Sequence, residues 1–228
     1  KNLFFVGFMF GFGFYLSGIF WISYSLTFDD NFKFLIPFAL IFIPLFLGLF
    51  YGLTTLIIGY FLSYNFSSLL LFSGSLALSD YVRGKILTGF PWNLWAYSWS
   101  WLTEVLQILN IFGLFAFNLL TITIFAIPAV IFFNCATSKK IFIICSSILL
   151  IFLTYIYGSF TINKNEILIN NFDKKNKVYT KVISPSFKLK YNLSFKEVEN
   201  KLKKMIKFSD PEPDKKTLFI WPEGIFTG

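Results

Sequence analysis

The chain has 228 residues, of which 56% are hydrophobic and only 14% are charged. Soluble globular domains carry about a quarter charged residues, so this composition is typical of a membrane protein. Histidine is absent, which excludes a Ser-His or Cys-His catalytic pair and a histidine-ligated metal within these residues.

Five apolar segments approach or exceed the roughly 20 residues that a helix needs to cross a bilayer. They are Leu3–Leu26, Phe34–Leu62, Ser67–Tyr81, Val105–Phe133 and Ile141–Tyr157. The third segment is short and ends in charged residues, so we expect it to tilt or to continue past its end. In the first segment, Gly7 and Gly11 have the spacing that permits close packing of helices.

The short loops predict how these segments are oriented. The loop Asn134–Lys140 contains two lysines and no acid, which is typical of a cytoplasmic loop. The loop Thr27–Lys33 is net acidic and is expected on the opposite side. Alternation from these two loops places the tryptophan-rich stretch 87–101, and everything after Tyr157, outside the cytoplasm.

The composition changes near residue 160. Residues 1–159 contain six Lys/Arg and four Asp/Glu, whereas residues 160–228 contain fourteen and eight. This difference predicts a transmembrane domain over 1–159, with about five helices, followed by a water-facing domain over 160–228. Because the chain begins without Met and ends soon after a WPEG motif, we expect a fragment that lacks both ends.

The second domain is predicted to mix strands and a helix. Ser194 and Glu197 have the spacing of a capping box, which starts an amphipathic helix. The last strand, "TLFIWPEG", is continuously apolar before its Pro-Glu, so we expect it to be buried. The predicted elements are strands over 166–171 ("EILINN") and 177–184 ("KVYTKVIS"), a helix over Phe195–Phe208 and a strand beginning at Thr217. This order is typical of the start of an α/β domain or of a layered α-β-β-α domain.

The stretch "LTGFPWNLWAYSWSW" (Leu87–Trp101) contains four tryptophans. Tryptophan gathers at membrane interfaces, so one interpretation is an aromatic belt. The alternative is the wall of a site that handles a lipid. We assign Trp95, Trp99 and Trp101 to the belt and leave Trp92, after the turn Gly89-Phe90-Pro91, for the second interpretation.

Glu223 is the most informative single residue for chemistry. It lies at the end of the last predicted strand, where α/β folds place catalytic groups. Partial burial there would raise its pKa and make it a usable general base. The alternative is a glutamate that faces solvent at a strand end, and position alone does not decide between the two.

Three stretches are informative together, namely "VGFMFGFGFYLSGIFWI" (Val6–Ile22), "YVRGKILTGFPWNLWAYS" (Tyr81–Ser98) and "LFIWPEG" (Leu218–Gly224). In their order and rough spacing they resemble the apolipoprotein N-acyltransferase family, a membrane-embedded branch of the nitrilase (carbon–nitrogen hydrolase) superfamily. "LTGFPW" is the most specific piece. The resemblance implies a polytopic α-helical membrane domain followed by the start of a nitrilase-like α-β-β-α sandwich.

The resemblance assigns roles to five residues. Glu223 matches the general base of the family's Glu-Lys-Cys triad. Gly89 and Trp92 match the Gly and Trp of the periplasmic "LTGFPW" loop, which the family needs for activity. Lys190 and Tyr191 are the best match to a Lys-Trp pair, with Tyr in place of Trp. The segment "PEGIFTG" also differs from the family's "PES" or "PET".

The resemblance also implies a reaction. An acyl chain passes from a phospholipid to a cysteine thiol as a thioester, and then to the N-terminal amine of a diacylglyceryl-cysteine apolipoprotein. The catalytic Lys and Cys would lie beyond Gly228, because Cys135 and Cys145 are expected in or near the bilayer and we interpret them as small apolar residues. No cofactor, metal or nucleic acid is implied. The expected location is the bacterial inner membrane, with the second domain in the periplasm.

On this interpretation, Trp92 and its turn border the opening through which an acyl chain reaches the triad. Arg83 and Lys85, just before the turn, could bind the lipid phosphate. Two other functions remain open. One is a membrane-tethered nitrilase-type amidase, which would share Glu223 without needing "LTGFPW". The other is a transporter or lipid-binding membrane protein without covalent chemistry.

Overall fold

The computed structural model describes residues 2–86, 89–171, 178–187 and 193–223. The chain divides into two compact units, residues 1–168 and 169–228. The expected domain boundary near residue 160 lies within helix α6 (Thr137–Asn170), eight residues before the division at 168. Lys190 and Tyr191 lie outside the described residues.

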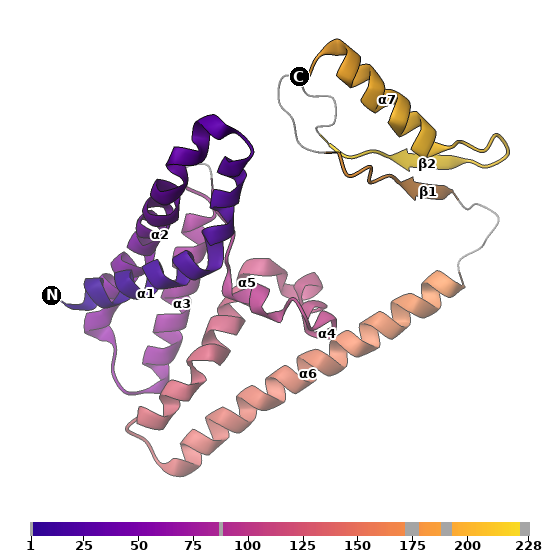
Figure 1. The fold of residues 1–228 in the computed structure, drawn as a ribbon. Helices are drawn as coiled ribbons and strands as arrows, with labels where there is room; N and C mark the ends of the chain where they lie inside the picture. Colours follow the sequence, from indigo (N-terminus) through magenta and orange to yellow (C-terminus); the bar gives the residue numbers. More distant parts are fainter. Residues whose placement is uncertain (1, 87–88, 172–177, 188–192, 224–228) are drawn as a thin grey trace. The chain divides into compact units, whose positions relative to one another are not determined.

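The first unit is built from helices (Figure 1). They are α1 (Asn2–Ile19), α2 (Ile36–Ile58), α3 (Phe66–Arg83), α4 (Thr103–Leu106), α5 (Leu109–Ala126) and most of α6. Short 3₁₀ stretches extend α1, α2 and α5, and a further 3₁₀ turn, Trp95–Trp99, precedes α4.

Four helical stretches among the described residues are long and apolar enough to cross a membrane. They are Asn2–Thr27, Asp30–Phe61, Leu109–Phe132 and Thr137–Asn170. These correspond to four of the five predicted segments, so the polytopic α-helical character of this unit is confirmed. The remaining segment, Ser67–Tyr81, forms α3, which continues past Tyr81 to Arg83 as one of the two expectations had it, but it does not qualify as a span by the same measure.

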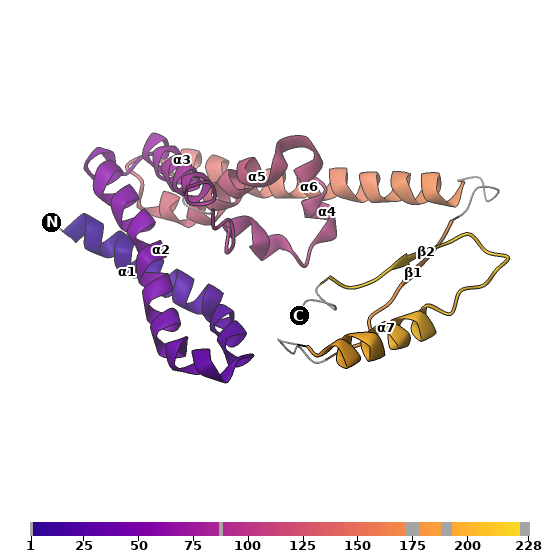
Figure 2. The same ribbon diagram turned by 90° about the horizontal axis from the view of Figure 1, so that it is seen from above.

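Helices α1 and α2 lie side by side (Figures 1 and 2), and glycines allow their close approach. A Cβ atom on Gly11 would lie 2.9 Å from Tyr51 Cβ and 3.0 Å from Gly48 Cα. A Cβ atom on Gly7 would lie 2.6 Å from the carbonyl oxygen of Tyr51. Close packing at Gly7 and Gly11, as their spacing predicts, is thus confirmed.

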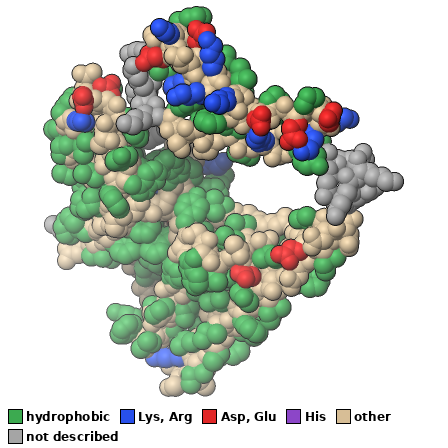
Figure 3. Space-filling model, turned by 45° about the vertical axis from the view of Figure 1, so that its right-hand side comes forward, with side chains coloured by type: hydrophobic (Ala, Val, Ile, Leu, Met, Phe, Trp, Pro, Cys, Tyr) green, Lys and Arg blue, Asp and Glu red, His purple; other side chains and the backbone are tan. Residues whose placement is uncertain are grey.

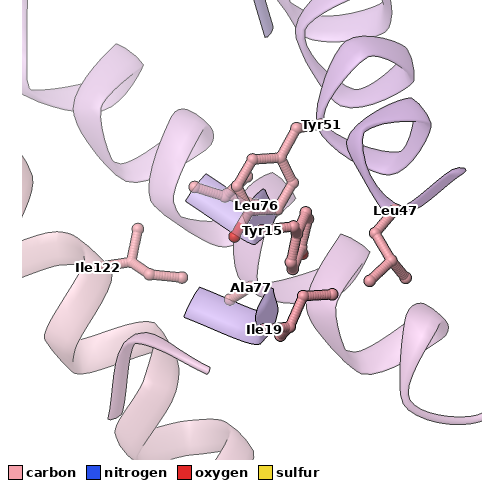
Figure 4. Packing of buried hydrophobic residues seen from close by; sticks show 7 residues of the cluster. All are labelled: Tyr15, Ile19, Leu47, Tyr51, Leu76, Ala77 and Ile122. Carbon is pink, nitrogen blue, oxygen red and sulfur yellow. The ribbon is translucent and has the colours of Figure 1, made fainter. Parts of the chain in front are cut away.

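The main apolar core of the first unit joins four helices (Figure 4). Its buried residues come from α1, α2, α3 and α5 and are Tyr15, Ile19, Leu47, Tyr51, Leu76, Ala77 and Ile122. The outward faces of the same helices carry exposed large hydrophobic residues such as Phe5, Phe42 and Phe152. Figure 3 shows hydrophobic side chains spread over much of the visible helical surface. Such a surface matches a lipid environment rather than water.

The second unit contains a parallel two-stranded sheet with a connecting helix. Strand β1 (Tyr179–Val182) pairs with β2 (Thr217–Ile220), and α7 (Phe195–Ser209) lies between them in sequence. Ile183 and Met205 form the small core, against which Phe219 and Trp221 pack. The predicted capping box is present, and the backbone N–H of Ser194 donates to Glu197 Oε2 at 2.9 Å.

Two predictions for the second unit are wrong. Residues 166–170 of the expected strand "EILINN" form the last turns of α6. The spacing of apolar residues in so short an aliphatic run does not distinguish a helix from a strand, and no helix-ending residue precedes the run. Strand β2 is also not fully buried, since Leu218 and Ile220 are exposed. These two residues alternate along the strand with less exposed ones, so one face of β2 lies open in the part of the chain that the structure describes.

Candidate functional site: the 89–92 loop and the polar network beneath it

The 89–92 loop, Gly89-Phe90-Pro91-Trp92, follows α3 and depends on its glycine. Gly89 has a φ of 74°, a conformation that residues with a side chain rarely adopt. A Cβ atom there would also lie 2.7 Å from the carbonyl oxygen of Gly84. The backbone N–H of Gly89 donates to the carbonyl of Ile86 at 2.9 Å. Glycine is therefore required for the chain to turn back at this point.

Arg83, the last residue of α3, binds the backbone of this loop through its guanidinium group. Its Nη1 donates hydrogen bonds to the carbonyl oxygens of Phe90 at 2.5 Å and Trp92 at 2.8 Å. Its Nη2 forms an ion pair with Asp80 Oδ1 at 3.2 Å. Only 2% of Arg83 is exposed. The expectation that Arg83 binds a lipid phosphate is therefore wrong, because its donors face the protein's own backbone. Lys85 is exposed and stays a candidate for that role.

Asp80 connects Arg83 to two other helices. It is completely buried, and its Oδ2 accepts a hydrogen bond from Asn118 Nδ2 of α5 at 2.9 Å. Its Oδ1 accepts a longer one, 3.4 Å, from the Tyr51 hydroxyl of α2. Asn118 Oδ1 in turn accepts the backbone N–H of Ala96 at 3.0 Å. We call Asp80, Arg83, Asn118 and Tyr51 the buried polar network.

The tryptophans after the loop are packed inward more than an aromatic belt would be. Trp95 stacks on Phe14 with ring centroids 4.6 Å apart, and its Nε1 donates to the Tyr51 hydroxyl at 2.9 Å. Trp99 Nε1 donates to Thr121 Oγ1 at 3.1 Å. The belt interpretation is therefore wrong for these two residues. Trp101, which is 73% exposed, is consistent with it.

Trp92 is the residue of the loop that faces outward. It is 46% exposed and stacks on Trp21, with ring centroids 5.1 Å apart and ring planes 17° apart. Its own backbone carbonyl is bound by Arg83, so the loop backbone is held while the indole lies at the surface. A half-exposed pair of indoles is suited to contact with an amphiphilic molecule.

An apolar groove lies behind Trp95. Its volume is ≈ 180 Å³, and it is lined by aromatic and aliphatic residues of α1, α3 and α5 that include Phe10, Leu76 and Ile122. A second groove of ≈ 370 Å³ shares Phe72 and Phe125 with it. The surface that runs from the tryptophan-rich turn along α3 and α5 is therefore apolar.

The structure brings together only some of the predicted site residues. Gly89 and Trp92 belong to one loop of the first unit. Glu223 belongs to the second unit, where it follows β2, and of the two alternatives left open by the sequence its side chain takes the exposed one.

Sequence reasoning missed the buried polar network. From the sequence, Asp80 is one of the charged residues at the end of the third apolar segment. The signal was present, because an Asp and an Arg three residues apart in an apolar segment are a typical intramembrane ion pair.

Comparison with known proteins extends these observations. Residues 1–127 match the family described as the apolipoprotein N-acyltransferase N-terminal domain. A protein named apolipoprotein N-acyltransferase from Rhodopseudomonas palustris is 26% identical over 230 residues, which is 96% of this chain and 42% of the relative. One of the same name from Rickettsia typhi is 32% identical over 160 residues, covering 70% of this chain and 32% of the relative.

A relative from Brucella melitensis, again named apolipoprotein N-acyltransferase, is 26% identical and covers 96% of this chain. The chain spans about two fifths of that relative's length, 41%. The family match includes all of the 89–92 loop and the helices α1 to α3 that support it. The chain belongs to the apolipoprotein N-acyltransferase family.

Proposed function

We propose that the full-length protein transfers an acyl chain from a phospholipid to the N-terminal amine of diacylglyceryl-cysteine apolipoproteins. The observation that carries this proposal is the family match across residues 1–127. The name shared by the relatives supports the same reaction class. The lipid-compatible surface and the outward-facing Trp92 are what an enzyme with a membrane substrate requires.

In the first half-reaction, Glu223 takes the proton of a cysteine thiol that lies outside these 228 residues. The thiolate sulfur attacks an ester carbonyl of the phospholipid, and a lysine, also outside the chain, stabilises the oxyanion. The carbon–oxygen bond to glycerol then breaks. The lysophospholipid leaves with the proton, and the acyl chain remains on sulfur as a thioester.

In the second half-reaction, the α-amine of the diacylglyceryl-cysteine attacks the thioester carbonyl. The carbon–sulfur bond breaks, an amide forms and the thiol is regenerated as the amine proton returns to sulfur through Glu223. Exclusion of water from the thioester favours the amine over hydrolysis. We assign Gly89 and Trp92 to the entry of the lipid, and Lys190 and Tyr191 to substrate binding.

Two features support the assignment of Glu223 as the general base. Glu223 lies three residues after the end of β2 (Ile220), a strand that is parallel to its neighbour, and α/β folds place catalytic groups near such strand ends. Its exposed carboxylate is accessible to a reacting partner. We further propose that the second unit begins a nitrilase-like α-β-β-α domain in the periplasm, and that the first unit lies in the inner membrane.

The test uses the full-length protein reconstituted in vesicles, with a phospholipid labelled in one acyl chain and a synthetic diacylglyceryl-cysteine peptide. We expect the labelled chain on the peptide amine, together with one lysophospholipid per acylated peptide, by mass spectrometry. Release of free fatty acid alone would indicate a hydrolase. Release of ammonia from small amides, without peptide acylation, would favour the amidase.

A further inference from the structure

Arg83 is an unusual residue for its place in the chain. It is the only arginine among 20 Lys/Arg residues, and it is buried at the end of an apolar helix. Removing two charges from water costs more than their mutual attraction returns unless further hydrogen bonds satisfy them. Both charges have such hydrogen bonds, but Arg83 Nε is buried without a partner in the described residues. A gain in folding stability alone is therefore a weak explanation for this ion pair.

The acceptors around Arg83 match the two terminal nitrogens of a guanidinium group. Two backbone carbonyls, of Phe90 and Trp92, meet at Nη1, while Asp80 meets Nη2. A lysine has a single nitrogen, which cannot occupy both positions at once. The site therefore requires the two-nitrogen fork of arginine rather than a positive charge alone.

The buried polar network also binds the backbone that follows the 89–92 loop, at Ala96. Asn118 bonds Asp80 through its amide nitrogen and the backbone N–H of Ala96 through its oxygen. Arg83 binds residues 90 and 92, so both ends of the segment 90–96 are attached to one buried cluster. Trp92 and Trp95 lie within this segment, and their positions relative to α1 and α2 depend on it.

We propose that Asp80, Arg83 and Asn118 are positioning residues that hold the segment 90–96 so that Trp92 stacks on Trp21 at the lipid entry. Arg83 acts through the carbonyls of Phe90 and Trp92, and Asp80 and Asn118 hold the guanidinium in place. The catalytic consequence rests on the proposed function. The placement of Trp92 by Arg83 does not, and it has a test of its own.

The variants are chosen so that no buried charge is left unpaired. Arg83→Lys keeps the charge and removes the fork. The double substitution Asp80→Asn with Arg83→Gln replaces the ion pair by neutral groups of similar size, which proteins often tolerate. The matched control is Asp30→Asn with Lys33→Gln, an exposed Asp–basic pair of the same three-residue spacing.

The first readout is spectroscopic. Two stacked indoles give a coupled circular dichroism band, and the difference between wild type and Trp92→Ala, in detergent, isolates the band from the Trp21–Trp92 stack. We expect both Arg83 variants to lose this band and the control pair to keep it. A folded Arg83→Lys or Asp80→Asn/Arg83→Gln protein that retains the band would overturn the proposal.

The second readout is acyl transfer by the full-length protein, with a phospholipid donor and with a short soluble thioester donor. Misplacement of about 1 Å can cost on the order of 10²-fold in rate, so we expect a loss of that order with phospholipid and a much smaller loss with the thioester. Arg83→Lys combined with Trp92→Ala should be no worse than Trp92→Ala alone. Multiplied losses, or equal losses on both donors, would mean that Arg83 acts independently of Trp92.

The two hypotheses fail in different ways. A wild-type protein that transfers no acyl chain from either donor would remove the proposed function, while the circular dichroism band would still decide whether Arg83 places Trp92. A transferring wild type whose Arg83 variants keep both the band and the phospholipid activity would remove only the positioning role.

Discussion

At the scale of single residues, the 89–92 loop depends on one glycine and one arginine. Gly89 provides the left-handed turn, with a φ of 74°, and Arg83 binds the carbonyls that the turn presents. Neither residue contacts solvent to any large extent. Together they fix the backbone conformation that places Trp92 at the surface beside Trp21.

Gly89→Ala is expected to disrupt this loop. The left-handed conformation costs a residue with a side chain on the order of 1–3 kcal/mol, and the new Cβ would lie 2.7 Å from the Gly84 carbonyl oxygen. Acyl transfer from phospholipid should fall strongly. The control is Gly74→Ala in α3, where no atom lies within 4 Å of the added Cβ. Comparable activity of the two variants would show that the turn is not needed.

Residue roles were predictable only where they depend on local geometry. The glycine of the Gly-Phe-Pro turn and the capping box at Ser194 follow from short-range rules. The burial of Asp80 and the inward packing of Trp95 do not, because their partners Asn118 and Tyr51 lie 38 and 44 residues away in sequence. The exposure of Glu223 likewise depends on tertiary packing.

At the scale of elements, the pair α1 and α2 has the most extensive contact between two helices among the described residues. Glycines on both helices remove side chains from the contact, and the backbones approach closely enough that a Cβ on Gly11 would lie 3.0 Å from Gly48 Cα. Helices in a membrane gain little from apolar burial against one another, so such packing contributes much of their association.

Gly11→Ala should therefore destabilise the membrane unit, by about 1–3 kcal/mol, the usual effect of overpacking. Gly13→Ala, two residues along the same helix, adds a Cβ with no atom within 4 Å and should have little effect. Thermal unfolding of both variants of the full-length protein in detergent measures the difference. Equal melting temperatures would contradict the close α1–α2 contact.

The elements themselves were largely predictable, since hydropathy identifies long apolar helices well. Helix α6 shows that hydropathy does not predict where such a helix ends. Its apolar part was predicted to end at Tyr157, but the helix continues to Asn170. The end of a bilayer-spanning segment is not the end of a helix, and the short run Ile167–Ile169 has no period that could distinguish strand from helix.

At the scale of the whole molecule, we propose that the two units have different roles in the reaction. The first unit supplies the lipid entry through the 89–92 loop, and the second supplies the base Glu223. This requires the chain after α6 to lie on the side opposite the loop Asn134–Lys140, whose two lysines favour the cytoplasm.

Alkaline phosphatase fusions test this topology, because the enzyme is active only outside the cytoplasm. Helix α6 has 34 residues, so it is about 51 Å long and exceeds the roughly 30 Å hydrocarbon core. A fusion after Asn171 therefore clears the membrane and should be active, whereas one after Ser138 should be inactive. The reverse pattern would place Glu223 in the cytoplasm and contradict the proposed reaction.

The proposed division of labour predicts two different defects in the full-length enzyme. Glu223→Gln preserves the size of the side chain and removes proton acceptance, which is typically worth roughly 10²–10⁴-fold in rate. Trp92→Ala removes contact with the lipid and leaves the chemistry intact. The exposed carboxylate Glu212, in the loop before β2, gives a matched control as Glu212→Gln.

The most direct measurement is therefore the rate of acyl-enzyme formation, followed by intact-protein mass spectrometry, with a phospholipid and with a short soluble thioester as donors. We expect Glu223→Gln to lose on the order of 10²–10⁴-fold with both donors, Trp92→Ala to lose activity mainly with the phospholipid, and Glu212→Gln to match wild type. Near-normal acylation of Glu223→Gln, or equal losses of Trp92→Ala with both donors, would contradict the account.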